Sequence, residues 1–188
     1  MARLYMVRHG RAAQNWDVAL DPPLDELGRQ QAEMRAQALA AELAPLPIVT
    51  SPLRRCRETA AFLAERWQTT PSVEARVREI PSPDGMEMAA RRQWLPRVLA
   101  ESWNTLPAED VAPLTAWRED LLRALHEYTQ DVVIFSHFVA TNVAVGVAQN
   151  DERLVSFFPA NASCTLLETD GKTLRLLKLG EEDRSVIS

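Results

Sequence analysis

The stretch Leu4-Tyr5-Met6-Val7-Arg8-His9-Gly10 decides how this chain is organised. Four apolar residues run directly into an arginine, a histidine and a glycine. A short, continuous apolar run of this kind is typical of a strand buried on both faces of a parallel sheet. Ligands bind at the carboxyl ends of such strands, so Arg8 and His9 stand where a site is expected. Gly10 allows a sharp turn or a close backbone approach at that point.

Length and composition indicate an ordinary globular protein. The 188 residues suffice for one domain, 1–188, with a substantial core. The net charge of −5 argues against a general nucleic-acid or membrane binder, because phosphate-rich partners need a broad basic surface. No apolar run approaches the roughly 20 residues of a membrane span, and the start of the chain has no secretory pattern, so a cytoplasmic location is expected. Cys56 and Cys164 lack CxxC spacing and are expected to be buried free thiols.

Apolar periodicity and turn residues predict alternating strands and helices. Ser51 and Ser136 each stand where they could cap a following helix. Residues 80–115 contain five prolines and break the alternation, so we expect a lid-like insertion of short helical pieces and loops. The predicted fold is a three-layer α/β/α sandwich with a mostly parallel central sheet and the insertion above its carboxyl edge. We expect strands at 3–8, 48–50, 72–77 and 131–135, helices at 27–43, 52–67, 114–128 and 138–147, and a terminal hairpin at 163–168 and 173–179.

Polar residues with related chemistry follow several of these strands. Arg8 and His9 end the first strand, and His137 follows the strand at 131–135. Arg55 falls in the first turn of the helix after the second strand, beside the positive helix end, which favours anion binding. Glu79 follows the third strand. If the strands are parallel, these side chains meet at one edge of the sheet.

Two arginines and two histidines, without metal-ligand spacing or a phosphate-binding P-loop, describe a metal-free pocket for a phosphate-sized dianion. A neutral imidazole can attack phosphorus and carry the phosphoryl group covalently. A carboxylic acid is then needed to protonate the leaving oxygen, and its conjugate base to activate water. No cofactor and no metal ion are expected.

The segment Leu4 to Asn15 resembles the signature of the histidine phosphatase (phosphoglycerate mutase-like) superfamily, whose strand-end Arg-His-Gly carries the phosphorylated histidine. The resemblance implies that His9 is the nucleophile, that Arg8, Arg55 and His137 bind phosphoryl oxygens, and that Asn15 lies at the rim of the pocket. Further matches extend along the chain, at Asp21 to Leu24, Gly28 to Ala32, Ser51 to Ala60, Val133 to His137 and Asn161 to Ser163.

Departures from the family pattern leave the proton donor open. Ala12 stands where a threonine or serine is common, and Phe138 replaces a usual glycine. After Glu79 the chain lacks the familiar Gly-x-Trp-Glu-Gly. We assign the proton donor to Glu79, because its position after a strand does not depend on how the insertion folds. Asp84 and Glu87 are the rival acids.

The sequence therefore predicts a phosphoric monoester hydrolase of the histidine acid-type that acts through a phosphohistidine on a small phosphorylated metabolite. The alternatives are a phosphoglycerate mutase, a phosphohistidine-protein phosphatase, and an inactive relative that binds phosphorylated ligands or proteins. The sequence leaves the substrate and the oligomeric state open, and a homodimer is one of the compatible states. Five insertion residues either contact a second anionic or ring-shaped substrate group or form a solvated arginine face with packing tryptophans: Arg91, Arg92, Trp94, Arg97 and Trp103.

Overall fold

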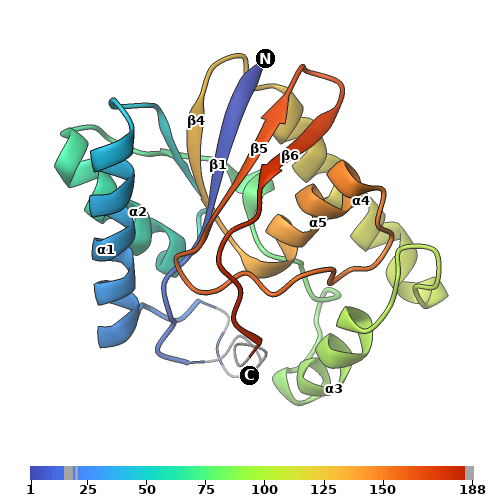
Figure 1. The fold of residues 1–188 in the computed structure, drawn as a ribbon. Coiled ribbons are helices and arrows are strands. Elements are labelled where there is room, and N and C mark those ends of the chain that lie inside the picture. The colour runs from blue at the N-terminus through green and yellow to red at the C-terminus, as the bar shows by residue number, and fades with distance from the viewer. Residues whose placement is uncertain (15–18, 20, 185–188) are drawn as a thin grey trace.

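A six-stranded sheet with helices on both faces forms the centre of the molecule (Figure 1). The computed structural model describes residues 1–14, 19 and 21–184. The strand order is β3-β2-β4-β1-β5-β6; the first four strands pair in parallel, and β5 pairs antiparallel with both β1 and β6. Helices α1 and α2 cover one face, and α4 and α5 cover the other. The predicted three-layer sandwich with a mostly parallel sheet is confirmed.

In chain order the elements are β1 (Ala2–Arg8), α1 (Glu26–Glu42), β2 (Ile48–Thr50), α2 (Arg54–Trp67), β3 (Ser72–Val73), the 3₁₀ helix η1 (Ala75–Val77), α3 (Met88–Leu99), α4 (Ala108–His126), β4 (Val132–Ser136), α5 (Phe138–Gln149), β5 (Cys164–Thr169) and β6 (Leu174–Lys178).

The central strands β1 and β4 owe their apolar runs to burial on both faces. Leu4 and Met6 belong to the core cluster under α4 and α5, whereas Tyr5 and Val7 belong to the cluster under α1 and α2. The two strands pair in parallel with Arg8 opposite Ser136. The residues that follow these partners therefore leave the sheet side by side at its carboxyl edge.

The third strand was predicted at 72–77, and its second part is wrong because β3 ends at Val73. Strand β3 contains only two residues, both exposed, at the edge of the sheet. The chain then turns into η1, where the Glu74 carboxylate accepts the backbone N–H of Arg76 at 2.9 Å. Glu79 thus arrives on a loop that follows a 3₁₀ turn and not directly on a strand.

The capping role predicted for Ser51 is also wrong. Helix α2 begins at Arg54 with Leu53 at its N-cap, and no side chain caps it there. The Ser51 hydroxyl lies before the helix, where it accepts the Leu53 N–H at 3.3 Å and contacts the ring of His137. The serine is a partner of the site and not the start of the helix.

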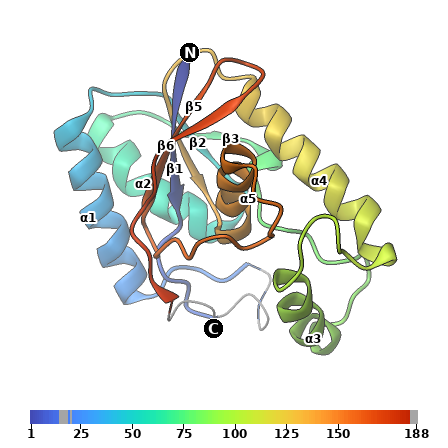
Figure 2. The same ribbon diagram turned by 45° about the vertical axis from the view of Figure 1, so that its right-hand side comes forward.

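The 80–115 region consists of α3, connecting loops and the first part of α4, which begins before the predicted position of 114. Buried Trp94 donates its indole N–H to Asp110 at 2.9 Å and so joins the two helices. Arg97 lies 3.4 Å from the same carboxylate, and Arg118 stacks 4.6 Å from the centre of the Trp103 ring. Both tryptophans therefore have packing roles. In Figure 2, α3 lies below and to the right of α5, at the end of the molecule toward which the carboxyl end of β1 points.

Both cysteine side chains are free thiols. Cys56 is buried and Cys164 is half-buried. Burial raises the pKa of the Cys164 thiol to about 12. Among the helices of the described chain, none combines the length and the apolar character needed to cross a bilayer.

Candidate active site

His9 leaves β1 with its ring held in one protonation state. Its Nδ1 lies 2.7 Å from the carbonyl oxygen of Gly10, and its Nε2 lies 3.1 Å from Nε of Arg55. An arginine N–H can only donate, so Nε2 must accept and carries the lone pair. Nδ1 then carries the proton and donates it to the Gly10 carbonyl. The ring is a neutral imidazole whose lone pair is on Nε2, where it accepts the Arg55 N–H.

Gly10 can make this turn because no side chain is present. A Cβ at Gly10 would lie 2.3 Å from the carbonyl oxygen of Gly28 in α1, closer than any real contact. The Gly10 N–H also donates to the hydroxyl of Thr59 in α2 at 3.0 Å. The backbone beside His9 is therefore fixed from two helices.

Two buried arginines flank the imidazole. Arg8 donates through one terminal nitrogen to the Pro159 carbonyl at 2.7 Å, and its guanidinium lies 5.1 Å from the centre of the Phe138 ring. Burial lowers the pKa of Arg8 to about 10, which leaves it charged at neutral pH. Its Nε is buried and has no hydrogen-bond partner among the described residues. A buried donor of this kind suits an anionic oxygen.

His137 lies beside His9, with the two ring centres 5.2 Å apart. Its Nε2 is 2.8 Å from the Ser51 hydroxyl and 3.3 Å from the Cys56 sulfur. All three of these side chains are buried. Ser51 therefore orients the second imidazole, a contact that the sequence did not predict.

Burial and the nearby positive charges favour the neutral form of both imidazoles. Burial, together with the positive charges of Arg55 and Arg8, lowers the pKa of His9 well below its usual range. The same causes, burial first, lower the pKa of His137. A histidine that stays neutral at acidic pH retains its nucleophilic lone pair there.

Glu79 is buried at the N-terminus of α5. Its carboxylate accepts the backbone N–H groups of Val139 at 3.0 Å and Ala140 at 3.3 Å. Burial raises the pKa of Glu79, while the backbone N–H donors and the charges of Arg55 and Arg8 oppose that rise. A carboxyl group with a raised pKa near an anion pocket is suited to proton donation.

The position of Glu79 corrects the prediction that Ser136 caps the helix at 138–147. Ser136 does not cap α5, because its hydroxyl donates to the Val77 carbonyl at 2.8 Å and Glu79 occupies the helix terminus instead. Arg76, a sequence neighbour of Glu79, pairs with Glu74 and Glu127 and so does not face the carboxyl.

The anion site predicted at the start of α2 is filled by the protein itself. Asp21 accepts the backbone N–H of Arg54 at 2.6 Å and lies 3.9 Å from a terminal nitrogen of Arg55. Arg55 does fall in the first turn, as predicted. Its contribution to the pocket therefore comes from the guanidinium and not from free amide groups of the helix.

The structure brings Arg8, His9, Arg55 and His137 together, with Glu79 within electrostatic range of both arginines. Asn15 lies outside the described residues. The rival acids Asp84 and Glu87 are both exposed, and Asp84 lines a separate groove between η1 and α4. No group of three or more His, Cys, Asp or Glu side chains that could hold a metal ion occurs within the described part of the chain.

The sequence profile of the histidine phosphatase superfamily (branch 1) matches residues 4–182. The chain belongs to this superfamily. The family's strand-end Arg-His-Gly is the stretch that delivers Arg8 and His9 in the structure.

Similar proteins include several phosphatases. The glucosyl-3-phosphoglycerate phosphatase of Mycolicibacterium vanbaalenii is 35% identical over 130 residues, which are 66% of this chain and 51% of that protein. The chain thus spans about half the length of the mycobacterial relatives that it matches. The 5''-phosphoribostamycin phosphatase of Niallia circulans is 30% identical over 162 residues, 76% of either chain.

Solved structures match the fold over nearly the whole chain. A mycobacterial glucosyl-3-phosphoglycerate phosphatase in complex with VO3 has a TM-score of 0.70 at 26% identity, covering 97% of this chain and 100% of that one. Bacillus stearothermophilus YhfR has a TM-score of 0.74 at 25% identity, with coverage of 97% and 98%.

Proposed function

We propose that this protein is a metal-independent phosphatase of the histidine acid-type that hydrolyses a small phosphate monoester through a phosphohistidine. One observation carries the proposal: the lone pair of neutral His9 is on Nε2, beside the guanidinium of Arg55. A nucleophile and a cation that neutralises phosphoryl oxygens then lie within hydrogen-bond distance of each other.

In the first step, His9 Nε2 attacks phosphorus while the bond from phosphorus to the ester oxygen breaks. Arg8, Arg55 and His137 bind the phosphoryl oxygens. Glu79 gives its proton to the departing oxygen, which leaves as an alcohol.

In the second step, the Glu79 carboxylate takes a proton from water, the hydroxide oxygen bonds to phosphorus, and the bond from phosphorus to His9 breaks. Inorganic phosphate is released and Glu79 is again protonated.

The substrate we propose is a phosphorylated metabolite that carries a sugar unit. Two relatives support this class by name, one a phosphatase of glucosyl-3-phosphoglycerate and one of 5''-phosphoribostamycin. We further propose that residues 1–188 act as one domain and that the 80–115 region acts as a lid for such a substrate.

The direct test is phosphate release by the purified, chelator-treated protein from a panel of sugar phosphates, phosphoglycerates and p-nitrophenyl phosphate. Turnover of at least one small ester, inhibited by orthovanadate, is the expected result. Transfer of phosphate between hydroxyls of phosphoglycerate without release would favour a mutase. Release only from phosphohistidine proteins would favour a protein phosphatase, and binding without turnover an inactive relative.

The pH dependence of this reaction follows from the shifted pKa values. His9 must be neutral, and because its pKa is lowered, activity should persist well below pH 6.5. Glu79 must be protonated, so kcat/KM for an alkyl phosphate should fall as the pH rises through its raised pKa. The Glu79→Gln variant cannot lose a proton at this position and should lack that alkaline limb. A limb that is unchanged in this variant would assign it to another group.

A further inference from the structure

A loop from the distant end of the chain holds the backbone of both Arg8 and His9. The N–H of Ala162 and the side-chain amide of Asn161 both donate to the carbonyl oxygen of His9, each at 3.2 Å. The carbonyl of Ser163 accepts the backbone N–H of Arg8 at 3.1 Å. We refer to residues 159–163 as the backing loop, since it supports the residues that present the nucleophile.

The backing loop contains a residue in an unfavourable conformation. Ala162 has φ +56°, in the left-handed region that non-glycine residues rarely adopt. Such a strained conformation persists only where the surroundings impose it. The contacts on either side of the Ala162 peptide therefore determine where its N–H points.

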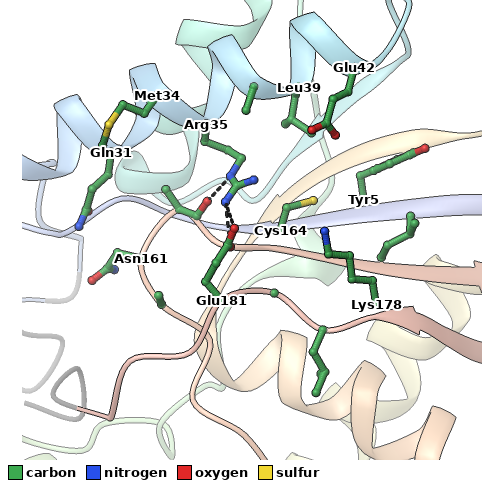
Figure 3. A pocket seen from close by; sticks show the side chains of 16 residues that line it. Tyr5, Gln31, Met34, Arg35, Leu39, Glu42, Asn161, Cys164, Lys178 and Glu181 are labelled. Carbon is green, nitrogen blue, oxygen red and sulfur yellow. Dashed lines mark hydrogen bonds and ion pairs between the residues drawn. The ribbon is translucent and has the colours of Figure 1, made fainter.

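Arg35 makes the contact on the carbonyl side (Figure 3). From α1, its Nε donates to the Ala162 carbonyl at 2.6 Å, and a terminal nitrogen binds both carboxylate oxygens of Glu181 at 2.9 and 2.8 Å. The backbone carbonyl of Glu181 in turn accepts the Ala160 N–H at 2.8 Å. One guanidinium thus ties α1, the backing loop and the segment after β6 together.

We propose that Arg35, oriented by Glu181, is a positioning residue that fixes the backing loop and thereby the direction of the His9 imidazole. The inference rests on the proposed function, because it concerns the geometry of that nucleophile. The Glu181 side chain is 65% exposed, so the ion pair itself adds little to the stability of the fold. Its effect is expected in the rate of the chemical step, where a displacement of about 1 Å can cost up to 10²-fold.

The surroundings of Arg35 allow a chemical rescue. Arg35, Asn161, Cys164 and Glu181 line an open groove of about 750 Å³ between α1 and the terminal strands (Figure 3). A guanidinium ion from solution can reach this groove once the arginine side chain is removed. Free guanidinium would then occupy the position between Glu181 and the Ala162 carbonyl.

The experiment compares Arg35→Ala with wild type, using p-nitrophenyl phosphate. We expect kcat to fall about 10- to 100-fold with KM little changed. Arg35→Lys should recover part of the loss, and guanidinium chloride below denaturing concentration should raise kcat of Arg35→Ala only. Arg66→Ala is the matched control, because it breaks an ion pair between Arg66 of α2 and Glu33 of α1 that does not involve the backing loop.

Glu181→Gln provides a second reading if Arg35→Ala folds poorly, and a several-fold loss of kcat is expected from it. Wild-type kcat in both Arg35→Ala and Glu181→Gln overturns the inference. A loss that neither lysine nor guanidinium restores, accompanied by a lower melting temperature, also overturns it by assigning Arg35 to the fold. A wild-type protein without turnover overturns the proposed function instead.

Discussion

Replacing His9 by alanine is expected to reduce the turnover of p-nitrophenyl phosphate by about 10⁴-fold or more, the scale of nucleophile deletions in covalent enzymes. The lone pair on His9 Nε2 accepts the Arg55 Nε–H, and the alanine side chain has no atom that could take this role. His9→Asn is the sharper variant. Its side-chain N–H can replace Nδ1–H toward the Gly10 carbonyl, whereas it has no ring nitrogen at the position of Nε2. Steady-state kinetics with both variants measures the effect.

The control is His126→Asn, because His126 is the one histidine of the chain that is assigned no part in the site. Nδ1 of His126 contacts the Thr169 hydroxyl at 3.1 Å, at the junction of α4 with β5 and away from the arginines. Its turnover should equal that of wild type, and all three variants should keep a wild-type circular dichroism spectrum. Turnover by His9→Asn within tenfold of wild type would contradict the assignment of the nucleophile.

The second large effect is expected from Glu79→Gln. General acid catalysis contributes roughly 10²- to 10⁴-fold, so hydrolysis of an alkyl phosphate should slow by about that factor. The loss should be smaller with p-nitrophenyl phosphate, whose leaving group hardly needs a proton. The glutamine oxygen can still accept the N–H groups of Val139 and Ala140, and the fold should tolerate the change. The two leaving groups are compared by kcat/KM at a fixed acidic pH.

Asp84→Asn and Glu87→Gln serve as the matched controls for Glu79. Both carboxylates are exposed in the wild-type protein. Each of the two variants should therefore lose little activity with either substrate. Equal losses of Glu79→Gln with the alkyl and the aryl ester would remove the proton-donor role from Glu79. A larger loss in either control would transfer that role to the insertion.

The sequence predicted the architecture because its strongest signals are local and repeat along the chain. Apolar runs ending in polar residues marked β1 and β4, and parallel pairing places Arg8 opposite Ser136. His9 and His137 then follow at the same edge, with their ring centres 5.2 Å apart. The assembly of the arginines and histidines therefore follows from strand ends and from the rule that parallel strands share an edge.

The errors occurred where a distant residue took the place of a local one. Serine before a helix is a good local signal for an N-cap, yet Glu79 caps α5 from 60 residues earlier along the chain. Ser136 is still part of β4 at that point, and its hydroxyl is bound to η1. Local patterns carry no information on such long-range contacts.

The short edge strand β3 and the contact between Arg35 and the backing loop were not predicted from the sequence for a related reason. Residues 72–77 alternate like a strand, but β3 is exposed at the sheet edge and Glu74 turns the chain into η1. Arg35 lies on α1 but is not one of its buried residues, which are small or apolar. Its contact with the Ala162 carbonyl joins residues that are 127 positions apart in the sequence, and local patterns do not predict such a contact.

The central claim is that His9 becomes phosphorylated during turnover, and rapid quenching of the reaction tests it most directly. Radiolabelled substrate is mixed with the protein, the reaction is stopped in alkali, and the labelled peptide is mapped. The account predicts an acid-labile, base-stable label on the peptide that contains His9, formed no more slowly than turnover and absent from His9→Asn. Turnover without any label, or a label on a different residue that forms at the turnover rate, would contradict it.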